Sequence, residues 1–132
     1  MDRYAFDTIL FPVNFVFFSQ TKFGPQVLDK AQQKQMGIMA LKGMAKTTWP
    51  ESTKNNHPHP KCWYEPAAFP HEAELGLRWT LSQPITAAIP DERYFRLGMD
   101  IGQNFQPITA RETQTLFAGA IGVNPLFCLK GT

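Results

Sequence analysis

The sequence has no apolar run long enough to cross a membrane as a helix, which takes roughly 18 to 20 residues. Its longest apolar run extends from Ile9 to Phe18, and Pro12 and Asn14 interrupt it. The first four residues show none of the charge and apolar pattern of a secretory signal peptide. We therefore expect a cytoplasmic protein with no membrane partner.

An excess of charge of one sign is also missing. The chain carries 13 Lys and Arg against 11 Asp and Glu, for a net charge of +2. No basic stripe and no DNA- or RNA-binding motif occurs, so nucleic acid is not an expected partner. The only two cysteines, Cys62 and Cys128, are far apart and form no C-x-x-C pair. Reduced thiols are the expectation.

Several common catalytic motifs are absent as well. The sequence contains no G-x-S-x-G nucleophile elbow, no G-x-G-x-x-G loop and no Walker loop. Glu72 and Glu74 fit the charged first turn of a helix better than an acid/base pair. The sequence therefore offers no nucleophile and no phosphate-binding loop of these types.

The 132 residues are 43% hydrophobic, which suits one domain with its own core. Short, nearly continuous apolar runs predict strands covered on both faces, as in a parallel sheet. The predicted strands are 8–14, 38–42 and 85–89. We expect loop or a short extension at Phe15–Phe18.

Helices are expected after each strand. Pro25 and Pro70 stand at first-turn positions, and Asp91-Glu92 opens a third helix whose buried face holds Tyr94, Leu97, Ile101 and Phe105. The spacing of Thr109-Ala110-Arg111-Glu112 predicts a capping box at the start of a last helix. That helix would bury Leu116, Phe117 and Ala120.

Residues 47–70 differ from the rest of the chain. They hold many of the eleven prolines together with Trp49, Trp63 and Tyr64. A loop of this length is functional or disordered in most proteins, and disordered segments are poor in aromatic residues. We expect an ordered, lid-like loop between a strand and the next helix.

The predicted order is that of an α/β protein with about three parallel βα units and a C-terminal helix. Three strands cannot close a barrel, and the two sheet edges remain open to pairing. The chain is therefore expected to be part of a larger α/β sheet, or to self-associate through its open edges.

His57, His59 and Cys62 are candidate zinc ligands, but the spacing H-x-H-x-x-C matches none of the strong two-pair templates. His71 is the remaining histidine, and no second pair follows. An exposed polar loop is favoured over a metal site here. No metal ligand is assigned.

Lys42-Gly43 is the strongest candidate for a binding site. Lysine is almost never buried unless it is paired, and Lys42 ends a predicted strand. One interpretation is that it reaches out to solvent. The other is that a cation followed by glycine, at the carboxyl end of a parallel strand, binds a phosphate or another anion. The next strand ends on the same side and leads to Arg93 and Arg96, which favours the second.

These residues resemble the C-terminal part of the aldo/keto reductases. The resemblance spans about Asp7 to Phe105, and it rests on the segments Ile9–Asn14, Gly37–Lys42, Leu77–Pro84 and Ala87–Pro90. It implies a partial (β/α)8 TIM barrel carrying the sixth to eighth strands, and an NADP(H)-dependent oxidoreductase that reduces small carbonyl substrates when the barrel is complete.

The resemblance also implies roles for individual residues. Leu41, Lys42 and Gly43 would line the nicotinamide and pyrophosphate, and Asn14 would lie near the nicotinamide. Arg93 or Arg96 would face the adenosine phosphate.

Two positions depart from the family. Leu10 stands where many relatives carry glutamine, and Asp91 stands where glycine or lysine is usual, so that its carboxylate would repel a 2′-phosphate. The family's catalytic Asp, Tyr, Lys and His come from the N-terminal half of the barrel, and no residue here matches them.

Three functions remain open at this point. The chain is a portion of a reductase, inactive alone; or a non-catalytic half-barrel that self-associates or only binds cofactor; or, more distantly, a small metal-binding protein using the histidine loop.

Overall fold

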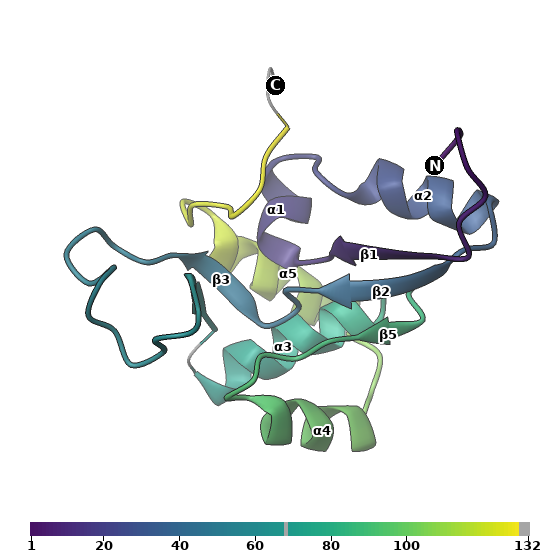
Figure 1. Cartoon of the computed structure of the whole chain (residues 1–132). Helices are drawn as coiled ribbons and strands as arrows, with labels where there is room; N and C mark the ends of the chain where they lie inside the picture. The colour runs from purple at the N-terminus through teal and green to yellow at the C-terminus, as the bar shows by residue number, and fades with distance from the viewer. Residues whose placement is uncertain (68, 130–132) are drawn as a thin grey trace.

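The computed structural model describes residues 1–67 and 69–129, which adopt an α/β fold (Figure 1). The elements in chain order are β1 (Thr8–Pro12), α1 (Phe15–Gln20), α2 (Pro25–Gln33), β2 (Gly37–Leu41), β3 (Ala45–Thr48), β4 (Tyr64–Pro66), α3 (Pro70–Leu81), β5 (Ala87–Ala88), α4 (Phe95–Gln103) and α5 (Ala110–Ala120). A three-stranded sheet has the order β1-β2-β5, and β3 pairs with β4 in a second sheet. The predicted mixture of helices with a parallel sheet is confirmed.

The main sheet is parallel throughout. β1 and β2 pair along their whole length, and β5 pairs with the middle of β2. The backbone N–H groups of Thr86 and Ile89 donate to the carbonyls of Ile38 and Ala40, both at 2.8 Å, so the pairing extends beyond β5 itself. This hydrogen-bonded segment lies within the predicted strand.

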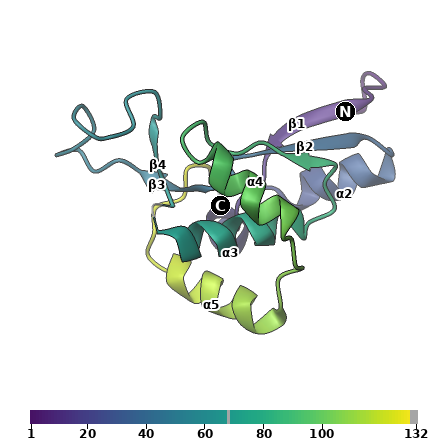
Figure 2. The same cartoon turned by 90° about the horizontal axis from the view of Figure 1, so that it is seen from below.

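Helices cover only one face of this sheet. Ile38 and Ala40 are buried against core residues of α2, α3 and α5, and Figure 2 shows these helices on one side of β1 and β2. Side chains alternate along a strand, so Leu10, Met39 and Leu41 point to the opposite face. There Leu10 is 59% exposed, and Met39 and Leu41 are half-buried. The prediction that both faces are covered is wrong for the described residues.

The segment after β1 is helical, where a loop was expected. α1 begins directly after Asn14, whose side-chain oxygen accepts the N–H of Val16 at 2.9 Å and caps the helix. Phe15, Val16 and Phe17 have modest helix propensity, but all three are buried. Tertiary packing therefore determines the conformation of this segment.

Within the long segment 47–70, the described residues form a pair of strands and a connection between them. β3 and β4 form an antiparallel ladder in which Thr48 faces Tyr64, with an irregularity between Ala45 and Thr47. The indole N–H of Trp49 donates to the carbonyl of Cys62 at 2.8 Å and ties the segment between the strands together. The aromatic residues of this segment predicted an ordered loop, and its described residues are ordered. The β3–β4 pairing was not predicted.

The C-terminal helices largely follow their sequence signals. α4 begins at Phe95 rather than at Asp91, because the Asp91 carboxylate accepts the N–H of Arg93 at 3.0 Å and forms a turn. α5 has the predicted capping box at Thr109. Leu116 and Ala120 are buried in the core.

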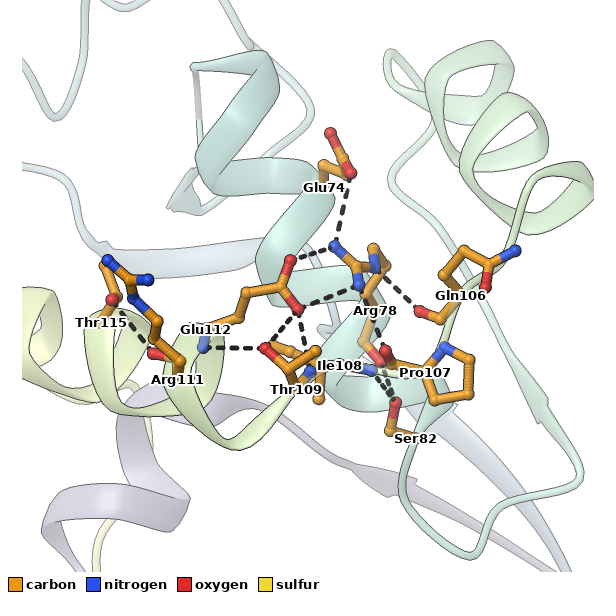
Figure 3. A network of polar contacts seen from close by, with 10 residues as sticks. All are labelled: Glu74, Arg78, Ser82, Gln106, Pro107, Ile108, Thr109, Arg111, Glu112 and Thr115. Atoms are coloured by element: carbon orange, nitrogen blue, oxygen red, sulfur yellow. Dashed lines mark hydrogen bonds and ion pairs between the residues drawn. The ribbon is translucent and has the colours of Figure 1, made fainter.

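Arg78 joins α3 to the beginning of α5 (Figure 3). Its guanidinium donates to both carboxylate oxygens of Glu112 at 2.8 and 3.1 Å, and to the carbonyls of Gln106 at 2.9 Å and Pro107 at 3.2 Å. Glu112 in turn accepts the N–H of Thr109 at 2.8 Å. The network holds the α4–α5 connection against α3, on the side away from the open sheet face.

Within residues 1–67 and 69–129, no helix combines the length and apolar character that a membrane crossing requires.

Candidate functional site at the carboxyl edge of the sheet

Parallel pairing brings the carboxyl ends of β1, β2 and β5 to one edge of the sheet, the edge at which open α/β sheets bind ligands. The chain leaves these strands through Asn14, Lys42 and Asp91 respectively. Leu41 and Gly43 flank Lys42, and the Leu41 side chain lies on the uncovered sheet face. The structure therefore brings together four of the six predicted site residues.

Asn14 is buried, with only 1% of its surface exposed. Its amide nitrogen donates to the carbonyls of Lys42 at 2.8 Å and Ala45 at 2.6 Å. Both amide hydrogens are thus bonded within the protein, and the side-chain oxygen caps α1. Asn14 connects β1 to the turn after β2, so it acts on this edge by holding the Lys42 backbone.

Lys42 has a left-handed backbone conformation, with φ of 66°. The turn closes with a hydrogen bond of 3.0 Å from the Ala45 N–H to the Lys42 carbonyl. A positive φ is uncommon for a residue other than glycine and adds strain. Here two hydrogen bonds to the Lys42 carbonyl, from the Asn14 amide and from the Ala45 N–H, hold the conformation.

Gly43 packs closely against α3. A Cβ atom at this position would lie 3.2 Å from both Cγ2 and Oγ1 of Thr80. Thr80 is fully buried, and its hydroxyl contacts the carbonyls of Val13 and Gly76 at 3.2 and 3.1 Å. The absence of a side chain at Gly43 therefore lets the turn approach the helix.

The ammonium group of Lys42 lies against two aromatic rings. Its Nζ is 4.2 Å from the ring centroid of Tyr64 and 5.4 Å from that of Trp63. Both distances are within the range of cation–π interactions. In the part of the chain that the structure describes, Lys42 forms no ion pair. This cation is thus held in place without being neutralised.

Tyr64 is itself held by Asp91. Its phenol donates to Oδ2 of Asp91 at 3.0 Å. Burial raises the pKa of the Tyr64 phenol, and the nearby Cys62 and Asp91 raise it further, so the group stays protonated and remains a donor. Burial also raises the pKa of the Cys62 thiol, which donates to the Tyr64 carbonyl at 3.0 Å and lies 3.6 Å from Asp91. This buried thiol is not an activated nucleophile.

Arg93 and Arg96 lie further along the same edge, after β5. Arg93 lines an open cavity of about 390 Å³, whose walls are His59, Pro60, Lys61, Cys62, Asp91, Glu92 and Arg93. Arg96 is exposed in the first turn of α4. Among the described residues neither arginine forms an ion pair. The edge therefore carries three cations without acidic partners in the described chain: Lys42, Arg93 and Arg96.

The histidine loop packs on Trp49. The ring of His57 stacks on Trp49 with centroids 3.9 Å apart, and His59 lies 5.9 Å from the same indole. Across residues 1–67 and 69–129, no group of three His, Cys, Asp or Glu side chains is arranged to hold a metal ion.

Sequence reasoning missed the partners of Lys42. In the sequence, Trp63 and Tyr64 stand out as aromatic residues of the long segment, and Asp91 stands out as the first residue of the predicted third helix. No local pattern links them to Lys42, because the contacts depend on the β3–β4 pairing. The register of that pairing is not visible in the proline-rich sequence.

No protein-family model, no curated protein and no solved structure matches this chain.

Proposed function

We propose that this chain forms the cofactor-binding, C-terminal part of an aldo/keto reductase-like (β/α)8 barrel, and that the complete barrel reduces small carbonyl compounds with NADP(H). In this proposal the bound nicotinamide supplies the hydride. The residues of this chain bind and orient the cofactor. The proton donor comes from the remainder of the barrel, because the family's catalytic tyrosine and lysine have no counterpart here.

The observation that carries the proposal is the one-sided sheet. Parallel sheets are covered on both faces in nearly all folds, and here helices cover one face only. In a barrel the helices lie outside and the opposite face lines the interior, which Leu10, Met39 and Leu41 would then fill. The strand order β1-β2-β5 follows the chain order, as it does in a barrel.

The cations at the carboxyl edge support a phosphate-bearing ligand. Barrel enzymes bind substrates and phosphates at this end. Lys42, Arg93 and Arg96 supply positive charge there, and the donor chemistry suits a pyrophosphate or a nucleotide phosphate. Leu41 and Gly43 would lie beside the ligand, whereas Asn14 would act through the turn that it holds.

Asp91 enters this proposal with a structural role. Its carboxylate accepts hydrogen bonds from Tyr64 and from the Arg93 backbone. These two bonds orient the acid toward the protein. They reduce the repulsion between the Asp91 carboxylate and a 2′-phosphate that the sequence alone would predict.

A second function is a non-catalytic half-barrel that self-associates or only binds cofactor. The exposed Leu10 on the open sheet face favours this alternative. Both functions predict cofactor binding or association, and they differ in whether a complete barrel reduces carbonyl compounds. We expect this chain alone not to oxidise NADPH with an aldehyde, since positioned proton transfer contributes roughly 10²- to 10⁴-fold. Steady turnover that a substitution in this chain abolishes would contradict the expectation.

Lys42→Met tests the cofactor site. Methionine keeps most of the side-chain length and removes the charge, so folding should change little. Affinity for NADPH, measured by cofactor fluorescence, should fall by about 1.5 to 3 kcal/mol, the range for hydrogen bonds to charged groups. That loss is more than about tenfold in dissociation constant. Lys54→Met, at an exposed lysine that pairs with Glu51, is the matched control and should bind as the wild type does. Equal affinities for all three proteins would show that Lys42 does not bind the cofactor.

A further inference from the structure

The Lys42 ammonium is placed by a neighbouring ring. A lysine side chain has four rotatable bonds and loses considerable entropy when it is fixed. The face of Tyr64, 4.2 Å from Nζ, attracts the ammonium and restricts where it can lie. Trp63 lies 5.4 Å from the same atom. Lys42 is therefore held close to one orientation before any ligand arrives.

Tyr64 is rigid enough to fix another side chain. It is buried, it belongs to β4, and its backbone pairs with Thr48 of β3. Its hydroxyl is bonded to Asp91, and the Asp91 carboxylate is anchored by the Arg93 N–H at 3.0 Å. The ring thus connects the end of β2 to the loop after β5 through direct contacts with Lys42 and Asp91.

We propose that Tyr64 is a positioning residue that acts on an anionic ligand through Lys42, with Asp91 holding the ring. This inference rests on the proposed function, because the ligand in question is the phosphate-bearing cofactor. Fixing the ammonium in advance reduces the entropy that binding would otherwise cost. The phenol itself does not contact the ligand. Tyr64→Phe, which keeps the ring, should therefore act differently from Tyr64→Leu, which removes it.

The first measurement needs no cofactor. In the NMR spectrum of the wild-type chain, the Lys42 Cε protons should be shifted upfield by the ring and should show nuclear Overhauser contacts to the Tyr64 ring protons. Lys42→Met identifies these signals by removing them. The upfield shift should persist in Tyr64→Phe and decline in Tyr64→Leu. Tyr4→Leu, which removes an exposed tyrosine ring at the N-terminus, is the control and should leave the shift unchanged.

The second measurement is a double-mutant cycle with NADPH as the probe. Tyr64→Leu should weaken binding about fivefold, as expected for one cation–π contact. In the Lys42→Met background the same substitution should have no further effect, because the residue through which it acts is already gone. A merely structural role for Tyr64 would weaken binding equally in both backgrounds.

The outcomes separate this inference from the proposed function. Equal losses in both backgrounds, or a wild-type spectrum without contacts between Lys42 and Tyr64, would overturn the inference even if NADPH binds tightly. If Tyr64→Leu does not fold, the wild-type spectrum alone decides whether the Tyr64 ring lies against the Lys42 side chain. Failure of the wild-type chain to bind NADPH would overturn the proposed function and the cofactor part of this inference. The spectrum would still decide whether Tyr64 orients Lys42.

Discussion

Gly43 lies in a turn that is pressed against α3, and the space at its Cα is small. A Cβ would lie 3.2 Å from Thr80, closer than most van der Waals contacts. Thr80 cannot easily move, because it is fully buried and its hydroxyl contacts the Val13 carbonyl. The resemblance assigns Gly43 to a ligand-binding edge, and the structure adds a packing reason for the glycine. The ligand-binding role predicts that a substitution at Gly43 changes ligand affinity, whereas the packing role predicts that it changes stability.

The prediction at this position concerns stability. Gly43→Ala should lower the free energy of unfolding by about 1 to 3 kcal/mol, the cost of overpacking a filled site. Gly119→Ala is the control, since nothing lies within 4 Å of its added Cβ and alanine favours the helix. That change should stabilise by about 0.5 to 1 kcal/mol. Urea unfolding followed by circular dichroism measures both. A Gly43→Ala protein as stable as the wild type would remove the packing argument.

Among the elements, α3 and α5 pack together in the apolar core, and the contact of Arg78 with Glu112 joins them at its polar margin (Figure 3). The hydrogen bonds from Arg78, supported by those from Thr109, lower the pKa of Glu112 from its usual 4.5 to about 2. A carboxylate with a lowered pKa in the folded state stabilises the fold at pH values above its unfolded pKa. That contribution is lost as the pH falls from about 4.5 through about 2.

Replacing Glu112 tests this link. Glu112→Gln keeps the shape of the capping box and removes the charge, so the variant should be less stable than the wild type at pH 7. The difference should shrink as the pH is lowered from 5 toward 2, since the wild-type carboxylate becomes protonated there. Chemical unfolding at a series of pH values measures it. Glu51→Gln, in an exposed pair with Lys54, should show no such trend. A difference that is constant with pH would contradict the assignment to charge.

The sequence predicted the elements whose signals are local. Pro70 in the first turn of α3 and the capping box at Thr109 both mark true helix starts. α1 was missed because its residues favour strands by propensity, and the reason for the helix is burial together with the Asn14 cap. The β3–β4 pairing was missed because prolines break the alternation that would reveal it. The burial of α1 and the β3–β4 pairing both depend on contacts between residues distant in sequence.

The site was predictable only in part for the same reason. Lys42 and Gly43 could be identified because both stand at the end of an apolar run. The burial of the Asn14 side chain depends on the turn after β2, and the contact of Tyr64 with Lys42 depends on the position of β4. No local sequence pattern specifies either arrangement. The identification of cations at the carboxyl edge therefore came from the sequence, and their orientation came from the structure.

For the whole molecule, the central feature is a parallel sheet with one uncovered face. Burying apolar surface is the main favourable contribution to folding, so an exposed Leu10 between half-buried neighbours is an unusual cost for a sheet. The free edges of β1 and β5 add unpaired backbone groups. Either the rest of a barrel or another copy of the chain would cover both features. When the rest of a barrel is absent, we expect another copy of the chain to cover the open face and the free edges.

The purified chain should therefore associate in solution, and Leu10→Glu should shift it toward the monomer. A charge on the open face would be buried by association and would oppose it. Ile121→Glu is the control, because Ile121 is 80% exposed but follows α5, away from the sheet. That variant should associate as the wild type does. Sedimentation velocity over a range of concentrations measures the effect. A wild-type chain that stays monomeric at every concentration would show that the open face is tolerated in water, and equal effects of the two substitutions would place the contact elsewhere.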